Sequence, residues 1–201
     1  GDNGADRFDN LDLRTFQNYS WSFQGDPRGI FIRDQFSRDA QLAMGHPAER
    51  GEFYHLYING YYWGLFNTDE RPEASYGETY FGGSKEDYDV VKIQTGPYTI
   101  FATDGTLDTW ADVWNLARGR GGRGYQTVIG NNQDGTRNPD LPVLIDPINL
   151  IDYILIILYG GNLDSPISAF IGNFAPNNFF SVINRENPDG YKHFVHDAEH
   201  T

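Results

Sequence analysis

The last nine residues of the chain carry a dense group of side chains that could do chemistry. Residues 193–201 read HFVHDAEHT and place two histidines, an aspartate and a glutamate within five residues. Imidazole and carboxylate groups together can bind zinc, whereas oxygen ligands suit the magnesium ion that accompanies a nucleotide. The same residues could also form a polar turn that only faces water. Which of these three interpretations applies depends on the helices and strands that position the segment.

A second group of polar residues precedes this segment. Asp164 lies in GNLDSP, and Asn178 directly precedes the apolar run FFSVIN. Phosphoryl transfer needs a carboxylate that orients the attacking hydroxyl and two oxygen ligands for Mg²⁺. In protein kinases a helix leads to an Asp base and a metal-binding Asn, and a metal-binding Asp follows. Asp164, Asn178 and Asp197 occur in that order, although the spacing is wider and the His-Arg-Asp and Asp-Phe-Gly motifs are missing.

Zinc hydrolysis is the competing chemistry. His196, Glu199 and His200 fit the H-x-x-E-H pattern of a family of zinc proteases. That chemistry requires both histidines on one helical face and a third ligand. Here the motif follows a predicted strand, so a zinc hydrolase is the less favoured hypothesis. Asp164 could likewise be only a turn residue, because Asn, Asp, Ser and Pro favour turns for local reasons.

The composition is that of a folded, acidic protein. The 201 residues carry a formal net charge of -13 and include 14 Phe, 13 Tyr and 4 Trp. The negative charge argues against nucleic-acid binding, which needs clustered Lys and Arg, and the aromatic content argues against disorder. The absence of cysteine excludes disulfides and thiol catalysis. The longest apolar stretch, residues 150–161, is too short to span a bilayer and predicts a buried helix.

The first part of the chain predicts a hairpin and a helix. Residues 53–70 contain two strand-like runs joined by Asn59-Gly60, a dipeptide that suits a two-residue type I′ turn. Residues 11–14 and Phe16 alternate loosely and predict a short strand. Residues 34–44 predict a helix with one apolar side. That side consists of Phe36, Ala40, Ala43 and Met44.

The middle of the chain predicts mostly loops. Residues 71–87 are rich in Gly, Tyr, Ser and acids and predict a loop with one helical turn. A short strand is expected over residues 89–94 and a helix over residues 107–117. The segment RGRGGRG, residues 118–124, is typical of a mobile, solvated loop.

The last part of the chain predicts a helix followed by a second hairpin. Asp146-Pro147 is a strong helix start, because Asp caps free N–H groups and Pro lacks one. The helix should run to Tyr159 and stop at the following glycines. FFSVIN and YKHFVH then predict two antiparallel strands. A hairpin returns the chain to its starting end, so Asn178 and Asp197 should lie side by side.

Four blocks of sequence, taken in order, resemble the spore-coat-protein-H (CotH) kinase family of secreted atypical kinases. They are FYHLYINGYYWGLFNTDERPE, INLIDYILIILYGGNLDSP, PNNFF and YKHFVHDAEHT. The resemblance implies an α+β, atypical protein-kinase-like fold with two β-hairpins and buried helices. It also implies transfer of phosphate from ATP, with Mg²⁺ or Mn²⁺, to Ser or Thr of exported or cell-surface proteins. Asp164 would be the catalytic base, and Asn178 and Asp197 would be the metal ligands.

The resemblance also sets expectations for the nucleotide side of the site. Within one domain, residues 1–70 would be the remnant of the N-lobe and the hinge, and residues 71–201 the C-lobe. The strand lysine that contacts ATP phosphates has no clear counterpart, so Arg14 is a candidate substitute, and the helix over 34–44 contains no Glu to pair with it. Glu70 is a candidate nucleotide contact. We expect the chain to be a piece of a longer protein with further domains and to lack the N-terminal strands.

A non-catalytic surface or adhesion module that binds a protein or glycan is the main rival. It is favoured by the missing lysine and by the aromatic-rich hairpin over residues 53–70. The expected partner of a kinase is instead a protein with a Ser or Thr acceptor, with neither nucleic acid nor a membrane span involved. The expected location is extracellular or at the cell surface in both cases.

Overall fold

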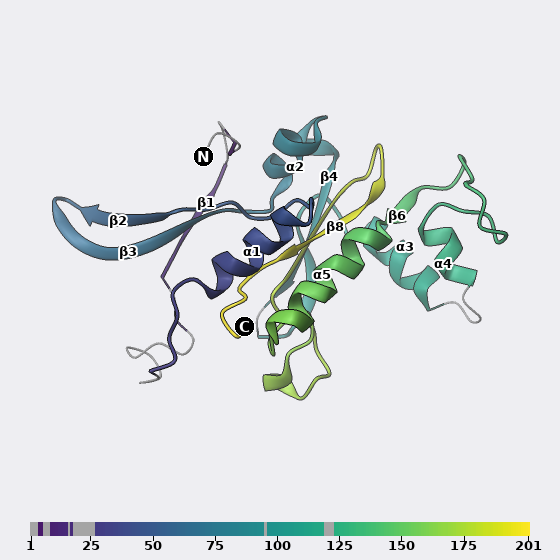
Figure 1. The fold of residues 1–201 in the computed structure, drawn as a ribbon. Coiled ribbons are helices and arrows are strands. Elements are labelled where there is room, and N and C mark those ends of the chain that lie inside the picture. The colour runs from purple at the N-terminus through teal and green to yellow at the C-terminus, as the bar shows by residue number, and fades with distance from the viewer. Residues whose placement is uncertain (1–3, 6–8, 16, 18–26, 95, 119–122) are drawn as a thin grey trace.

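The computed structural model describes residues 4–5, 9–15, 17, 27–94, 96–118 and 123–201. Within these ranges the chain forms two β-sheets and five α-helices (Figure 1). This arrangement confirms the predicted α+β class. None of the helices in the described part of the chain is long and apolar enough to cross a membrane.

The smaller sheet has three antiparallel strands in the order β1-β3-β2. They are β1 (Leu11–Arg14), β2 (Phe53–Ile58) and β3 (Tyr61–Glu70). The turn between β2 and β3 has φ angles of 51° at Asn59 and 84° at Gly60, as a type I′ turn requires. This confirms the predicted hairpin, which projects away from the rest of the molecule (Figure 1).

The larger sheet has five strands in the order β5-β4-β7-β8-β6. They are β4 (Tyr88–Gln94), β5 (Thr99–Asp104), β6 (Val143–Ile145), β7 (Phe179–Asn184) and β8 (Asp189–Val195). Neighbours are antiparallel except for β6 and β8. The strands alternate their side chains between two apolar clusters, one on each face. The β7–β8 hairpin was predicted, whereas β5 and β6 were not.

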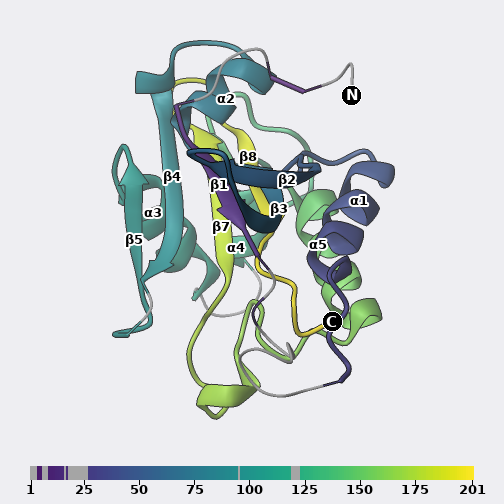
Figure 2. The ribbon, with the colours of Figure 1, turned by 90° about the vertical axis from the view of Figure 1, so that its left-hand side faces the viewer.

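The five helices pack around this larger sheet. They are α1 (Arg33–Ala43), α2 (Ala74–Phe81), α3 (Asp108–Ala117), α4 (Arg123–Val128) and α5 (Pro147–Gly160). Helices α3 and α5 contribute to one core cluster and α2 to the other. Helices α1 and α5 lie side by side in both views (Figures 1 and 2).

Helix α5 begins and ends as its sequence predicts. The Asp146 carboxylate accepts hydrogen bonds from the backbone N–H groups of Ile148 and Asn149, each at 3.1 Å. Gly161 ends the helix with a φ angle of 70°. The GNLD turn that carries Asp164 therefore begins where the helix ends.

The prediction that α5 is a buried helix is wrong for one of its faces. Tyr153, Ile156 and Ile157 are buried, but other apolar residues face outward. The exposed set is Ile148, Ile151, Leu155, Leu158 and Tyr159. The helix packs on the sheet with one face only, and its sequence is apolar on all faces, so its period does not reveal which face is covered.

The predicted orientation of α1 is reversed. Phe36 is 53% exposed and Met44 is 43% exposed, although both belong to the apolar side that the sequence predicts. The buried face instead consists of Asp34, Ser37, Arg38 and Gln41. Gln41 explains part of this reversal, because its side chain bonds to the carbonyl of His193 at 2.7 Å and to the N–H of Val195 at 2.9 Å. The polar face of α1 thereby satisfies backbone groups of β8.

Two loop predictions also need correction. Residues 71–87 contain a complete helix, α2, and a 3₁₀ turn over Lys85–Asp87 instead of a loop with one helical turn. The buried ring of Tyr76 anchors α2 against Phe194 at a centroid distance of 5.1 Å, a long-range contact that local propensity does not reveal. In the predicted loop over 118–124, residues 119–122 lie outside the described residues, and α4 begins at Arg123.

Buried His193 makes the stability of the fold depend on pH. Its ring packs at centroid distances of 5.8 Å from Tyr153 and 5.5 Å from Phe179, and burial lowers the pKa of His193 to about 4. The unfolded chain binds a proton at this histidine with a pKa of 6.5, above the folded value. The contribution of neutral His193 to stability is therefore complete above pH 6.5 and is lost as the pH falls toward 4. We expect a loss of about 3 kcal/mol from this group.

The measurement is the free energy of unfolding by denaturant at a series of pH values for wild type and His193→Gln. Gln cannot be protonated, so the stability difference between the two proteins should shrink between pH 7 and pH 4. The exposed His55 provides the matched control, because His55→Gln also removes one imidazole but leaves the buried core untouched. A difference that stays constant across this range would contradict the assignment.

Candidate functional site

The turn that follows α5 holds the Asp164 carboxylate in one orientation. The side chain of Asn162 accepts the N–H of Asp164 at 2.8 Å. One carboxylate oxygen of Asp164 accepts a hydrogen bond from the Ser168 hydroxyl, and the other accepts from the Asn178 side-chain amide at 3.0 Å. His200 Nε2 lies 4.0 Å from that second oxygen. Residues far apart in the sequence therefore converge on one partly buried carboxylate.

Asn178 and Asp197 lie at the same end of the β7–β8 hairpin. Phe179, the first residue of β7, pairs with Val195, the last residue of β8. The Asn178 amide nitrogen is 3.5 Å from the backbone oxygen of Asp197. The structure thus brings Asp164, Asn178 and Asp197 together, as the hairpin geometry required.

Asn178 and Asp197 share an unusual backbone conformation. Their φ angles are 47° and 52°, in the left-handed region that residues other than glycine rarely adopt. Asn and Asp tolerate this region better than other side chains do. Such strained positions concentrate at functional sites, where the surrounding structure holds them. Five of the described non-glycine residues have a positive φ angle, and both predicted metal ligands are among them.

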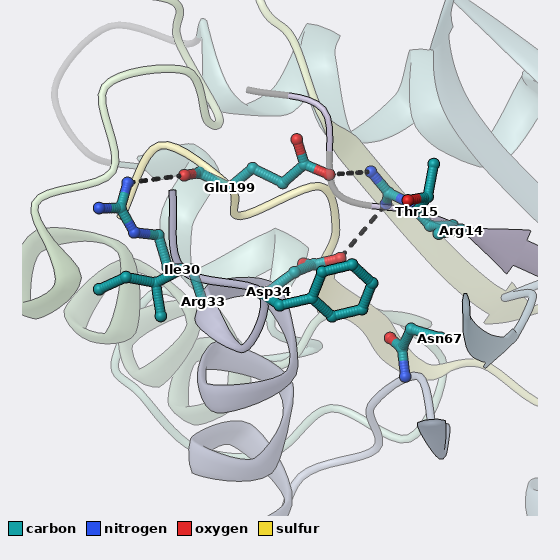
Figure 3. Close-up of a pocket in the computed structure, with 8 residues that line it drawn as sticks. Arg14, Thr15, Ile30, Arg33, Asp34, Asn67 and Glu199 are labelled. Carbon is teal, nitrogen blue, oxygen red and sulfur yellow. Dashed lines mark hydrogen bonds and ion pairs between the residues drawn. The ribbon is translucent and has the colours of Figure 1, made fainter. Parts of the chain in front are cut away.

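Arg14, from the end of β1, reaches into the same region. Its guanidinium contacts the Asp197 carboxylate. It also lies 3.3 Å from Asp34 and 3.5 Å from Glu199 (Figure 3). Burial alone would lower the pKa of Arg14, but Asp34 and Asp197 raise it above its usual value. The guanidinium is therefore permanently charged. A cavity of about 20 Å³ adjoins it, room for roughly one water molecule.

Asp34 ties α1 to the HDAEHT segment. Its carboxylate accepts the backbone N–H of Ala198 at 2.8 Å and contacts Arg14 (Figure 3). Burial alone would raise the pKa of Asp34, but Arg38 and Arg14 hold it below its ordinary range. The helix therefore does supply an acid that pairs with the strand arginine. The sequence prediction considered only Glu as the partner acid on α1, so it did not identify the shorter Asp34.

A buried network of ion pairs contacts Asp34 through Arg38, at 3.5 Å. Arg38 is fully buried, contacts the Asp69 carboxylate and the Asn67 side chain, and lies 3.9 Å from Glu49. Burial raises the pKa of Asp69 to about 6 despite the neighbouring Arg38. These residues were missed because charged residues on a helix or strand are usually solvated, and no short motif distinguishes the exception.

Glu70 lies apart from this cluster. In the β1–β3 register Glu70 pairs with Leu11, whereas Arg14 pairs with Asn67 three positions further along. Both Glu70 carboxylate oxygens accept from the Tyr80 hydroxyl at 2.7 Å. The structure therefore places Glu70 at the opposite end of β1 from Arg14.

The residues of the zinc hypothesis point in different directions. His196 bonds to Glu49 at 2.8 Å, and Glu199 contacts Arg14. His200 lies beside Asp164 instead. The segment is a turn after β8 and not a helix, so its spacing does not put both histidines on one face. The described residues contain no group of three or more His, Asp or Glu that could hold a metal ion.

Asn178 and Asp197 nevertheless have the donor chemistry of a magnesium site. The amide nitrogen of Asn178 points to Asp164, which leaves the amide oxygen as a ligand. Asp197 follows the last strand at the same end of the hairpin, and its carboxylate, which contacts Arg14, is a second oxygen ligand. Mg²⁺ prefers such oxygen ligands, keeps several waters and is bound by one or two protein groups plus phosphates. Mn²⁺ accepts the same ligands, so the residues fit either ion.

Comparison with known proteins gives one family. No curated protein matches the chain. The family model described as CotH kinase protein matches residues 24–184. The matched region includes Asp164 and Asn178 and ends before Asp197. Because the match covers most of the 201 residues, the chain belongs to the CotH kinase family.

Proposed function

We propose that the protein transfers the γ-phosphate of ATP to Ser or Thr hydroxyls of other proteins, assisted by Mg²⁺ or Mn²⁺. The observation that carries the proposal is the meeting of Asp164, Asn178 and Asp197 at one end of the β7–β8 hairpin. Family membership supports kinase-like function in general. The finer assignment rests on the order and chemistry of these three side chains.

Asp164 acts as the base in this proposal. Its carboxylate accepts the proton of the attacking hydroxyl, whose oxygen forms a bond to the γ-phosphorus as the bond to ADP breaks. Its hydrogen bonds to Ser168 and Asn178 keep it oriented before substrate arrives. When bound, the divalent ion neutralises phosphate charge, and Asn178 and Asp197 would hold it.

Arg14 takes the place of the strand lysine in this proposal. Its contact with Asp34 on α1 resembles the Lys–Glu ion pair of protein kinases. Glu70 would contribute on the nucleotide side at a distance from this pair. Residues 1–70 would form the N-lobe remnant and hinge, and residues 71–201 the C-lobe, of a protein acting outside the cell or at its surface.

A non-catalytic adhesion module remains the second candidate because of the β2–β3 hairpin. The hairpin exposes a group of aromatic side chains that could bind a protein or glycan. They are Tyr54, Tyr57, Tyr61, Tyr62 and Trp63. Nucleotide binding distinguishes the two candidates, because the adhesion module does not require it.

Transfer of labelled γ-phosphate to a mixture of Ser- and Thr-containing peptides tests the proposed function. We expect incorporation with Mg²⁺ or Mn²⁺ and none after the ions are removed with EDTA, because the phosphate charges are then not neutralised. Incorporation that is unaffected by EDTA would contradict the metal-assisted reaction. Absence of both transfer and nucleotide binding would favour the adhesion module.

A further inference from the structure

An apolar groove of about 620 Å³ lies between the start of β5, helix α3 and the loop that follows Asp164. None of the described residues that line it is charged. Four of its large apolar side chains are exposed: Leu107 by 36%, Trp114 by 55%, Ile167 by 55% and Phe174 by 83%. Such a concentration of exposed apolar surface around one hollow is typical of a binding site.

The groove and the candidate phosphotransfer site share one loop. Residues 165–177 connect Asp164 to Asn178, and their two arms run antiparallel, with Ile167 opposite Pro176. Hydrogen bonds join Ser168 to Ala175 at 3.2 Å and Asn177 to Pro166 at 3.0 Å. Ile167 and Pro176 line the groove, whereas the neighbouring Ser168 hydroxyl binds Asp164. An occupant of the groove therefore contacts the loop that positions the proposed base.

The edge of the larger sheet indicates the kind of occupant. Strand β5 is the outer strand of that sheet (Figure 2), and its first residues, Thr99 and Ile100, line the groove. An edge strand offers backbone N–H and C=O groups along its open side. An extended polypeptide can pair with such an edge and place alternate side chains in the adjacent hollow. A lipid or other small apolar molecule makes no use of the edge.

We propose that this groove docks an extended, apolar segment of the acceptor protein, which pairs with β5 and inserts large aliphatic or aromatic side chains beside Trp114 and Phe174. The inference rests on the proposed function for the identity of the partner as an acceptor. It adds a substrate-docking surface next to the phosphotransfer site. The docked segment is a part of the acceptor other than the phosphorylated residue, because it lies across the loop from Asp164.

Fluorescence anisotropy with a labelled peptide that alternates Leu or Phe with Thr tests the docking surface. Phe174→Glu should weaken binding by about tenfold, because it puts a charge beside an apolar contact. Tyr159→Glu is the matched control, since Tyr159 is an equally exposed aromatic residue on α5, outside the groove, and its variant should bind like wild type. A second peptide with Pro in place of each Thr should bind poorly, because Pro cannot pair with a strand edge.

Equal binding by wild type and Phe174→Glu, or equal binding of the Pro-containing peptide, would overturn the proposal. So would a wild-type protein that binds laurate in the groove and not the peptide. These readouts need no ATP, so peptide docking can succeed even if phosphate transfer fails. If transfer does occur, a Ser acceptor attached to the docking peptide should show a raised KM and an unchanged kcat in Phe174→Glu.

Discussion

Replacing Asp164 with Asn is expected to lower the rate of phosphoryl transfer by about 10²- to 10⁴-fold, the usual contribution of a positioned general base. An amide has the shape of the carboxylate but cannot take the proton of the acceptor hydroxyl. The fold should survive, because the Asn oxygen can still accept from Asn178 and its nitrogen can donate to the Ser168 hydroxyl. Single-turnover transfer and ATP affinity are the two measurements.

The proposed role of Asp164 predicts a separation between these two measurements. ATP affinity should stay within about twofold of wild type, because the base contacts the acceptor and not the nucleotide. Asp189→Asn serves as the control, since Asp189 is largely exposed and its variant should transfer phosphate at the wild-type rate. A wild-type transfer rate in Asp164→Asn would remove Asp164 from the mechanism.

Replacing Arg38 with Met is expected to destabilise the fold by about 3–5 kcal/mol, the usual cost of removing one partner of a buried ion network. Arg38 is fully buried against the carboxylates of Asp34, Glu49 and Asp69. Its loss removes the positive charge that these three acids share, and Asp69 then keeps no ion-pair partner among the described residues while Asp34 keeps only Arg14. The free energy of unfolding at pH 7, from denaturant titration, is the measurement.

Arg71→Met is the matched control for this network. Arg71 also contacts acidic residues, Asp12 and Glu73, but its side chain is 30% exposed. Ion pairs at the surface contribute little, so this variant should lose less than about 1 kcal/mol. If both variants lose similar free energy of unfolding, burial does not make the ion pairs of Arg38 more stabilising than those of Arg71.

Much of the local structure was predictable because it follows from short-range chemistry. Asn59-Gly60 specifies a tight turn through its backbone conformation, and Asp146-Pro147 specifies the start of α5 through capping. The meeting of Asn178 and Asp197 follows from the second hairpin, since antiparallel strands bring their outer ends together. The positions of the two strands in the sequence were therefore enough to predict this part of the candidate site.

The orientation of α1 could not be predicted, because long-range polar contacts decide it. Phe36 and Met44 indicated an apolar side, yet the helix buries Arg38 and Gln41. Their partners are a strand residue, Asp69, and the backbone of β8, and both are far away in sequence. Hydrophobic period describes helices that pack through apolar contacts, and it fails where polar groups satisfy each other in the interior.

The nucleotide side of the candidate site was only partly predictable. Arg14 was a candidate from its place on a strand, and the structure puts it against Asp34 and Asp197. The partner acid Asp34 went unnoticed, and Glu70 lies at the other end of β1. Residue type and order suggested which groups could take part, but only the packing of α1 against β8 determines which of them meet.

Calorimetric titration of ATP into wild type and Asp197→Asn, with and without Mg²⁺, tests the central claim most directly. Asn suits the left-handed conformation at this position, so the variant removes a charged ligand and retains the backbone. The account predicts that Mg²⁺ strengthens ATP binding to wild type and that this gain falls by at least about tenfold in the variant. An equal Mg²⁺-dependent affinity in the two proteins would contradict the assignment of Asp197 and of the site built around it.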